Sequence, residues 1–462
     1  MPKRFELGLW PHKLIKAIQR QDIVQKISRS PFEGGVFLVG GAIRELVLGK
    51  FPKDYDFAIT NPDDLGVFEK ALGAHAFLLG KKPIKTYRIV SQDLSLDLTF
   101  LETSIAEDLS RRDFTMNAIA YDVRDGKLID SLGGFKDIHD GVIRCPRRKA
   151  LTDDPLRMLK AVRHFATMEG FTLDGELVDA IHDFKHLILS VAPERIRYEM
   201  DQIVISPNAY GGLTMLQQVG LLFQLFPELH ALKRLDQEQG FVLSTYGHTL
   251  EGYKYLKRYG DKYGLDERDL RNVAYALLFH DIGKAHTFSR DEKKNVVHFF
   301  HHERFSATRA ALIMEKLRFS TVDNKTVCKL IEHHMRIFLI SNSDSTEKAI
   351  RRLVYRIGEL TPLLVVLTLC DMYGSSGGTE NESTFMVTKR CDELLEAHKE
   401  WQKKPLPRLV NGHDLLAIGF EQGPRMGKVL HEIREKQLNG ELVLKDEALA
   451  YARNHLKETV GS

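Results

Sequence analysis

Two aspartates with strand spacing, Asp54 and Asp56, follow a pair of glycines at Gly40 and Gly41. Side chains two residues apart on a strand point to the same face, so both carboxylates could hold the same metal ions. Phosphoryl transfer uses divalent ions that bridge the attacking and leaving oxygens, and such hard cations prefer carboxylate ligands. Glycines in a turn let backbone amides come close to a triphosphate. The pattern predicts a phosphoryl-transfer site, although a solvated acidic turn has the same spacing.

A third carboxylate, Asp97, lies inside the apolar strand pattern LSLDLTF of residues 94–100. A charged residue at the centre of a strand needs a partner or a function. We expect Asp97 to stand on the metal side of the site, where it could act as the base toward the attacking hydroxyl. An aspartate on an edge strand that faces water is the alternative.

Residues 110–118, SRRDFTMNA, carry a resemblance to known proteins. With the glycine turn and the three carboxylates they resemble the DNA polymerase β nucleotidyltransferase superfamily, and more narrowly the RRDFTxNA motif of class II tRNA nucleotidyltransferases and bacterial poly(A) polymerases. The resemblance implies that Asp54, Asp56 and Asp97 are catalytic and that Asp54 and Asp56 hold Mg²⁺. It also implies that the incoming nucleotide is bound by Gly40, Gly41, Arg44, Arg111, Arg112, Asp113 and Asn117. Arginine suits this role because its guanidinium can grip a phosphate with two hydrogen bonds.

Residues 151–157, LTDDPLR, resemble the E-D-x-x-R motif at the start of the family's neck helix. By position, Asp153, Asp154 and Arg157 would select the nucleotide without a nucleic-acid template. Positions i and i+3 share a helix face, so Asp154 could accept from the exocyclic amine of cytosine or adenine while Arg157 donates to the ring nitrogen. Uracil and guanine would leave polar groups unmatched. The family usually has glutamate where Asp153 stands, and an ordinary acidic helix cap before Pro155 is the alternative.

Only four residues, 103–106, separate the Asp97 strand from the segment that leads into the RRDFTMNA motif. In bacterial CCA-adding enzymes and A-adding relatives this place holds a longer flexible loop, whose movement helps the site switch from C to A. A site without that loop should keep one pocket shape. We therefore expect CTP to be added to the 3′ end of tRNA, with release of pyrophosphate, and addition to stop after two cytidines. The alternatives are a full CCA-adding enzyme that also uses ATP and, less favoured, an A-adding enzyme, a poly(A) polymerase or an RNA-binding protein with a vestigial head.

Later in the chain, the segment FHDIGKA at residues 279–285 resembles the HD phosphohydrolase superfamily. The metal ligands implied by this resemblance are, in chain order, His248, His280, Asp281, His302, His334 and Asp371. Imidazole and carboxylate ligands suit a divalent metal such as Ni²⁺, Mn²⁺ or Mg²⁺ without selecting among them. The implied activity is metal-assisted hydrolysis of 2′,3′-cyclic phosphate or phosphate at RNA ends, with Lys284 near the phosphate. A domain that only binds RNA or shapes the body is the alternative.

The elements that must position these residues change in kind near residue 150. Periodicity predicts strands at 36–40, 55–59, 86–90, 94–100 and 118–123, helices within 1–30 and 41–49, and helices from about 150 onward. The expected fold class is α+β, with a small polymerase β-type nucleotidyltransferase head built on a mixed β-sheet, then an all-α neck, body and HD domain. The expected domains are the catalytic head at 1–149, a neck and body with the nucleotide-selecting helix at 150–230, the HD domain at 231–380, and a helical tail at 381–462 that could contact tRNA.

Composition and charge set broader limits. The 462 residues are 43% hydrophobic and 28% charged, with a net charge of +3, which is typical of a globular protein of several domains. No apolar run approaches the roughly 20 residues that span a membrane, and residues 1–14 lack the apolar core of a signal peptide. The four cysteines form no CxxC pair, which suits a reducing compartment. We therefore expect a cytoplasmic protein that meets no membrane and whose partners are the tRNA 3′ end and CTP; its oligomeric state is left open.

Overall fold

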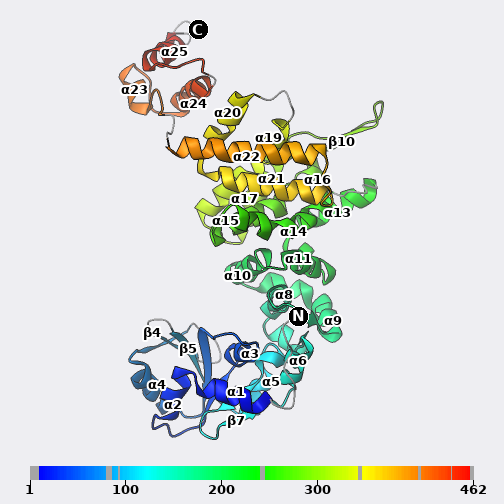
Figure 1. Ribbon diagram of the computed structural model, residues 1–462, viewed down its shortest axis with the longest axis vertical. Helices are drawn as coiled ribbons and strands as arrows, with labels where there is room; N and C mark the ends of the chain where they lie inside the picture. The colour runs from blue at the N-terminus through cyan, green and yellow to red at the C-terminus, as the bar shows by residue number, and fades with distance from the viewer. Residues whose placement is uncertain are drawn as a thin grey trace. The chain divides into compact units, whose positions relative to one another are not determined.

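The computed structural model describes residues 10–79, 86–91, 94–239, 245–341, 346–403, 407–438 and 440–457 (Figure 1). The chain divides into two compact units, residues 1–227 and 228–462. Residues 1–9 of the expected helical stretch 1–30 lie outside the described residues. The predicted change from mixed to helical structure near residue 150 therefore falls inside the first unit.

A seven-stranded mixed sheet forms the first part of this unit, in the order β3-β4-β5-β2-β1-β6-β7. The strands are β1 Val36–Val39, β2 Asp54–Ile59, β3 Ala76–Leu78, β4 Thr86–Ser91, β5 Leu94–Phe100, β6 Ala120–Asp122 and β7 Lys127–Ile129. β2 and β5 are parallel, and the other neighbouring strands of this sheet are antiparallel. β2 ends in the buried run 57–59, as expected of a strand at the centre of a core. The mixed sheet confirms the predicted α+β class.

Short helices connect and cover these strands. They are α1 Trp10–Gln19, α2 Asp22–Ser28, α3 Gly41–Val47, α4 Leu65–Leu72, α5 Ile105–Ser110 and α6 Gly134–Asp140, with the 3-10 turns η2 Pro62–Asp64 and η3 Thr115–Asn117. The Phe68 ring of α4 packs edge-on against Phe57 of β2, with ring centroids 5.4 Å apart. Leu109 of α5 packs in one cluster with Val39 and Ala120. This contact fixes the start of the RRDFTMNA segment against the sheet.

The rest of the first unit is helical apart from the strand pair β8 Val142–Ile143 and β9 Thr172–Leu173. Its helices are α7 Lys149–Asp153, α8 Leu156–Thr167, α9 Gly175–Phe184, α10 Pro193–Val204, α11 Ala209–Gln218 and α12 Leu221–Leu225, with the 3-10 segment η4 Lys185–Ser190. Helices α8, α10 and α11 pack tightly because α11 carries Gly212. A Cβ there would lie 2.9 Å from both Ala166 of α8 and Ile203 of α10. The prediction of a largely helical remainder is confirmed. The expectation that it is all-α is wrong, because residues 172–173 form a strand here and residues 288–291 and 296–299 form a β-ribbon further along the chain.

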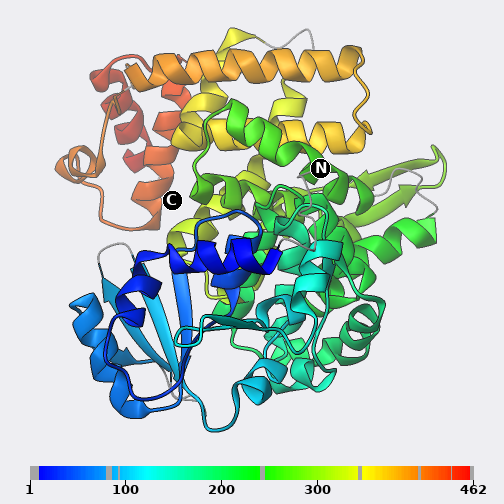
Figure 2. The same ribbon diagram turned by 60° about the horizontal axis from the view of Figure 1, so that its bottom comes forward.

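In its described residues the second unit is helical with one β-ribbon (Figures 1 and 2). Its elements are α13 Pro227–Gln239, α14 Gly247–Lys262, α15 Glu267–Phe279, α16 Lys284–Thr287, β10 Phe288–Asp291, β11 Val296–Phe299, α17 His302–Lys316, α18 Thr321–His333, α19 Met335–Leu339, α20 Glu347–Ile357, η5 Gly358–Leu360, α21 Thr361–Ser375, α22 Glu382–Lys403, α23 Gly412–Ala417, α24 Pro424–Leu438 and α25 Lys445–Lys457. Helices α14 and α21 touch closely, since a Cβ on Gly374 would lie 2.4 Å from the His248 carbonyl. This approach brings His248 beside the helix that carries Asp371.

One helical run of the second unit, 347–375, is long and apolar enough to cross a membrane by length and hydropathy. The sequence predicted no run of this length and hydropathy. Within it, α21 contacts α14, α15 and α22, and 67% of the apolar window is buried inside the protein. A helix that is apolar on all sides and buried by its neighbours is a core helix.

Candidate functional site

The three predicted carboxylates of the head lie on one face of the neighbouring strands β2 and β5. Asp54 and Asp56 lie at i and i+2 of β2, and Tyr55 between them is buried on the opposite face. Asp97 pairs directly with Asp56 in the parallel register of β2 and β5, so their side chains point the same way. Because β5 lies between β4 and β2, the alternative of an edge-strand aspartate is wrong.

This cluster gathers negative charge that a bound cation would balance. Burial raises the pKa of Asp56; Arg112 opposes the rise, while Asp97, Asp113 and Asp54 add to it. Oxygen ligands that converge from neighbouring strands are the donors that Mg²⁺ prefers. The carboxylates present therefore fit a divalent metal of this class.

Gly40 makes room for the cluster. Its backbone has a φ of +78°, a conformation that side chains other than glycine rarely adopt. An added Cβ would lie 2.5 Å from Asp56 Oδ2 and 3.3 Å from Arg112 Nη1. A side chain at this position would therefore displace the carboxylate. Gly41, the next residue, begins α3.

Arg88, which the sequence analysis did not single out, holds Asp97 with two hydrogen bonds. Its Nε donates to Oδ1 at 2.7 Å and its Nη2 donates to Oδ2 at 2.8 Å. These bonds raise the pKa of Arg88. The pair forms because the antiparallel register of β4 and β5 sets the two residues opposite each other. A local sequence pattern does not give that register, since it depends on which strands become neighbours.

The motif residues after α5 form a chain of hydrogen bonds. Asn117 Nδ2 donates to Asp113 Oδ1 at 2.9 Å, and Arg44 Nη1 donates to Asn117 Oδ1 at 2.5 Å. Lys160 Nζ lies 3.7 Å from Asp113 Oδ2. Burial would raise the pKa of Asp113, but Lys160, the Asn117 amide and Arg157 outweigh it and hold that pKa below its usual range. Asp113 is thus a buried anion that organises the polar groups around it.

Arg111 and Arg112 are oriented from α5. Arg111 pairs with Glu107 and Arg112 pairs with Asp108 at 2.9 Å, each one helical turn back along the chain. The Arg111 and Arg112 side chains are 36% and 20% exposed. Both guanidinium groups can therefore exchange a carboxylate for an incoming phosphate.

The predicted nucleotide-selecting residues stand at a break between two helices. α7 ends at Asp153, Asp154 is extended, and α8 begins at Leu156. The interpretation that Asp154 shares a helix face with the residue three places on is therefore wrong. Pro155 is the reason, because proline disfavours helical backbone in the residue before it. Asp154 Oδ1 accepts from the Leu156 amide at 3.3 Å, as the helix-cap alternative expects, and Asp153 pairs with Arg147 at 3.2 Å.

Protein groups nevertheless orient Asp154 and Arg157. Arg195 Nη2 donates to Asp154 Oδ2 at 2.9 Å. The Arg157 guanidinium donates to the backbone carbonyls of Arg111 at 2.9 Å and Arg112 at 3.3 Å. These bonds tie the start of α8 to the RRDFTMNA segment.

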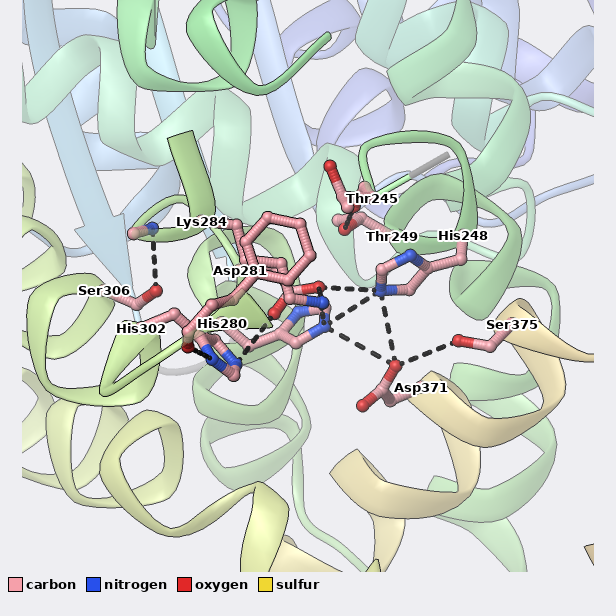
Figure 3. A network of polar contacts seen from close by, with 12 residues as sticks. Thr245, His248, Thr249, His280, Asp281, Lys284, His302, Ser306, Asp371 and Ser375 are labelled. Carbon is pink, nitrogen blue, oxygen red and sulfur yellow. Dashed lines mark hydrogen bonds and ion pairs between the residues drawn. The ribbon is translucent and has the colours of Figure 1, made fainter. Parts of the chain in front are cut away.

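The six predicted HD residues form a second cluster, in the other unit (Figure 3). His248 comes from α14, His280 and Asp281 follow α15, His302 begins α17, His334 follows α18, and Asp371 comes from α21. The Nε2 atoms of His248 and His280 lie 3.1 Å apart, and those of His302 and His334 lie 3.3 Å apart. Asp281 lies between the two pairs, with Oδ2 3.1 Å from His248 and Oδ1 3.4 Å from His302.

Backbone carbonyls fix the orientation of three of these imidazoles. The Nδ1 atoms of His280, His302 and His334 lie 2.8, 2.9 and 2.7 Å from the carbonyl oxygens of Leu277, Phe299 and Ile331. Each Nδ1 donates its proton there, so a neutral ring turns the lone pair of Nε2 into the cluster. Lone pairs that face one another at these distances need a positive charge between them, which is a proton in the metal-free protein, as the raised pKa of His280 indicates, or a metal ion when one is bound. The imidazoles therefore fit a metal ion.

The carboxylates of the cluster support the same conclusion. Asp281 Oδ1 is buried and accepts no hydrogen bond from the described residues. Burial lowers the pKa of His280, but Asp281 and Asp371 outweigh it and raise that pKa to about 10. Burial raises the pKa of Asp281, but His280 and Lys284 hold it well below its usual range. The site thus favours positive charge between two carboxylates, and the donor set does not select one divalent metal.

Asp236, which is absent from the sequence predictions, anchors the start of α14. Its buried carboxylate accepts from the Thr245 amide at 2.8 Å, the Thr245 hydroxyl at 2.6 Å and the Tyr246 amide at 2.8 Å. These bonds fix the turn that leads to His248, as groups behind a metal ligand commonly do. In the sequence, Asp236 stands among other charged residues of a helix and cannot be told from a surface aspartate.

Three family models match the sequence. They are a poly(A) polymerase head domain over residues 82–144, a probable RNA- and SrmB-binding site of polymerase A over 170–233, and an HD domain over 245–373. An A-adding tRNA nucleotidyltransferase of Deinococcus radiodurans is 33% identical over 442 residues, which are 94% of this chain and 98% of that protein. A CC-adding tRNA nucleotidyltransferase of Thermus thermophilus is 32% identical over 424 residues, 90% of this chain and 92% of that protein.

Solved structures share the fold. The Bacillus stearothermophilus CCA-adding enzyme in complex with CTP aligns with a TM-score of 0.63 at 21% identity, over 98% of this chain and all (100%) of that one. The Thermotoga maritima CCA-adding enzyme complexed with tRNA aligns with a TM-score of 0.55 at 19% identity, over 98% and 97% of the two chains. The order of a mixed-sheet head and a helical remainder is therefore common to these proteins.

Proposed function

This chain belongs to the class II tRNA nucleotidyltransferase family, and from that premise we propose that its head adds two cytidines to the 3′ end of tRNA and then stops. In each addition the terminal 3′ hydroxyl attacks the α-phosphorus of CTP, one phosphoanhydride bond breaks, and pyrophosphate leaves. Nucleotide addition to tRNA 3′ ends is the activity of the family. The restriction to cytidine is the part that is specific to this proposal.

The short connection between β5 and α5 supports the restriction. Only residues 101–104 separate the two elements. The Leu101 amide donates to the Ile59 carbonyl at 2.8 Å, and Ser104 caps α5 by accepting from the Glu107 amide at 3.3 Å. The connection is thus anchored at both ends, with no long loop that could move over the site. A pocket that keeps one shape should keep one base preference.

Addition of adenosine to a CC end is the second candidate, because an A-adding and a CC-adding relative are about equally similar to this chain. Extension of three tRNA transcripts, which lack CCA, CA or A, distinguishes the two. Each transcript is incubated with CTP, ATP or both in the presence of Mg²⁺. Two additions of CTP and none of ATP are expected. Addition of ATP to the CC end alone would identify an A-adding enzyme, and completion of CCA would overturn the restriction.

The residues of the head divide into three roles in this proposal. Asp54 and Asp56 would hold Mg²⁺, which when bound supplies positive charge to the triphosphate. Asp97, oriented by Arg88, would accept the proton of the attacking hydroxyl. The incoming nucleotide would be bound by Gly40, Gly41, Arg44, Arg111, Arg112, Asp113 and Asn117, and selected by Asp153, Asp154 and Arg157.

Asp97 and Arg88 can be separated by substitution. Asp97→Asn should lower the single-turnover rate of CTP addition about a hundredfold, because it removes the base. Arg88→Ala should lower it only about tenfold, because the carboxylate remains and loses the two bonds that orient it. Arg88→Lys keeps the charge without the paired bonds and should fall between. Equal losses of rate in both single variants, with no further loss in the double variant, would show that Asp97 and Arg88 act only as a structural pair and that Asp97 is not the base.

Asp154→Ala should reduce the preference for CTP over UTP roughly 10- to 100-fold, because the acceptor for the exocyclic amine of cytosine is lost. The measurement is kcat/KM for each nucleotide on a tRNA that lacks CCA. Asp179→Ala, an exposed aspartate on α9, is the matched control and should keep the preference. An unchanged preference in Asp154→Ala would place base selection elsewhere.

For the HD centre we propose hydrolysis of 2′,3′-cyclic phosphate or phosphate at RNA 3′ ends. Water would open the cyclic ester by breaking one P–O bond and leave a monoester. The ligands would be His248, His280, Asp281, His302, His334 and Asp371, and the bound metal supplies an activated water. The Lys284 ammonium donates to Asp281 at 2.6 Å and stays 18% exposed, so it can also meet a phosphate. Ring opening with Ni²⁺, Mn²⁺ or Mg²⁺, and its loss with a chelator, test this proposal.

A further inference from the structure

The β10–β11 ribbon interrupts the HD sequence between Asp281 and His302. It is antiparallel and projects beyond the helices around it in both views (Figures 1 and 2). Asp291 Oδ1 accepts from the amides of Lys293 and Lys294 at 3.0 and 3.2 Å, which closes the tip of the ribbon. The two lysine side chains are exposed there.

The two faces of β11 differ. Phe299 turns toward Phe288 and the Lys284 ammonium, which lies 5.5 Å from its ring. His298 lies on the opposite face, because side chains alternate along a strand, and Phe300 is the first residue after β11. Their rings stack, with centroids 4.8 Å apart and 14° between the planes. Phe300 is 65% exposed, so most of its ring faces water.

The residue between the two members of this aromatic pair contacts the HD centre. The Phe299 carbonyl accepts from Nδ1 of His302 at 2.9 Å, and His302 is the first residue of α17. Phe300 is therefore two residues away from an expected metal ligand. Arg304 and Phe305, in the first turn of α17, are exposed beside it. The segment that carries the aromatic pair thus leads, within two residues, to a residue of the cluster.

Charge distinguishes this surface from an ordinary exposed aromatic residue. Lys293 and Lys294 are exposed at the tip of the ribbon, and Glu292 is the exposed acidic residue beside them. Arg290 is exposed as well, but it pairs with Val297 and lies on the other face of the ribbon from His298. An aromatic face with cations along the adjoining path is the arrangement that binds single-stranded nucleic acid, because bases stack on the ring and phosphates meet the cations. Isolated exposed aromatics are common on proteins and carry no such set of neighbours.

We propose that the β10–β11 ribbon binds the single-stranded 3′ end of an RNA whose terminal phosphate enters the HD centre. The inference rests on the hydrolytic function proposed for that centre and names its substrate as an RNA strand rather than a free nucleotide. The last base stacks on Phe300 and His298, and phosphates upstream meet Lys293 and Lys294. A strand rises about 3.3 Å per residue, so the tip is roughly 15 Å from Phe300, a span of a few nucleotides. Stacking accepts any base, so little sequence preference is expected.

The test compares two substrates on the full-length, Mn²⁺-loaded protein. One is an RNA octamer that ends in a 2′,3′-cyclic phosphate, and the other is bis(p-nitrophenyl) phosphate, which has neither base nor upstream phosphate. Phe300→Ala should lower the ratio of kcat/KM for RNA to kcat/KM for the small diester about tenfold. Lys293→Ala/Lys294→Ala should lower the same ratio at low salt and less at high salt, because phosphate contacts weaken as salt rises.

Matched variants lie elsewhere in the same unit. Phe385→Ala removes a phenylalanine of α22 that is 66% exposed, and Lys316→Ala/Lys325→Ala removes two exposed lysines of α17 and α18. Both should keep the wild-type ratio. If the wild type hydrolyses both substrates and the ratio is unchanged in the ribbon variants, the ribbon binds something other than RNA, such as a protein. In that case the inference about the ribbon is overturned and the proposed hydrolytic function stands. If the wild type hydrolyses neither substrate, both the proposed hydrolytic function and the inference about the ribbon are overturned.

Discussion

Asp54→Ala should lower the rate of CTP addition by at least about a thousandfold, because the charge neutralisation supplied by a bound metal amounts to several kcal/mol. Asp54 is exposed at the start of β2, so the change leaves the core intact. Asp56→Asn should have a similar effect, since its carboxylate is the neighbour of Asp97 in the paired strands. Single-turnover extension of a tRNA that lacks CCA measures both variants.

The control for these variants is Asp63→Ala, an exposed aspartate on η2 of the same unit, which should keep wild-type addition. HD hydrolysis should be unchanged in Asp54→Ala, because the carboxylate cluster and the histidine cluster belong to different compact units. A folded Asp54→Ala protein that loses both activities would contradict the assignment of one reaction to each site. A rate of CTP addition within tenfold of the wild-type rate would show that Asp54 has no catalytic role.

His280→Ala should abolish HD hydrolysis and sharply weaken metal binding, while CTP addition continues. His280 is buried with the carboxylates of Asp281 and Asp371, which raise its pKa and favour positive charge on its ring in the metal-free protein. Removing one partner from a buried ionic cluster leaves uncompensated charge, which costs about 3–5 kcal/mol. The metal-free variant should therefore unfold earlier than the metal-free wild type. Metal content after dialysis and calorimetric unfolding measure the two effects.

His333→Ala is the matched control for His280→Ala, because His333 is the sequence neighbour of His334 and is not among the residues that converge on the cluster. It should keep metal content and hydrolysis. In the wild type, a chelator should lower the unfolding temperature of the second unit, and added Mn²⁺ should restore it, since a ligand that binds only the folded state stabilises it. An unfolding temperature that the chelator does not change would show that the cluster holds no metal.

Much of the head site could be predicted because its pattern is local. The spacing of Asp54 and Asp56 puts both carboxylates on one face of any strand, whatever the strand's neighbours are. The RRDFTMNA segment is short, and its Asp113, Asn117 and following turn form hydrogen bonds among themselves. Helix 156–167 also follows from its own apolar spacing. Such features need only a few consecutive residues.

The helix geometry predicted for Asp154 and Arg157 is wrong, although the sequence contains the evidence against it. Pro155 stands between the two residues, and α7 ends before it while α8 begins after it. A proline biases the preceding residue toward extended backbone, and Asp154 has φ −142° and ψ 97°. The sequence therefore favoured the helix-cap alternative for the backbone geometry of Asp154. The role of Asp154 and Arg157 in base selection stays a prediction.

The sequence by itself determined the fold class and predicted the chemical type of each site, because strand and helix periods and contiguous motifs depend on neighbours along the chain. Only the tertiary structure decided that Arg88 meets Asp97, that Asp236 holds the turn before His248, and that an aromatic ribbon stands beside the HD centre. These contacts depend on strand register and on how the chain turns between elements, which a local sequence pattern does not give. Strand register and close helix contacts, such as that of α14 with α21 at Gly374, arise only when the whole core packs.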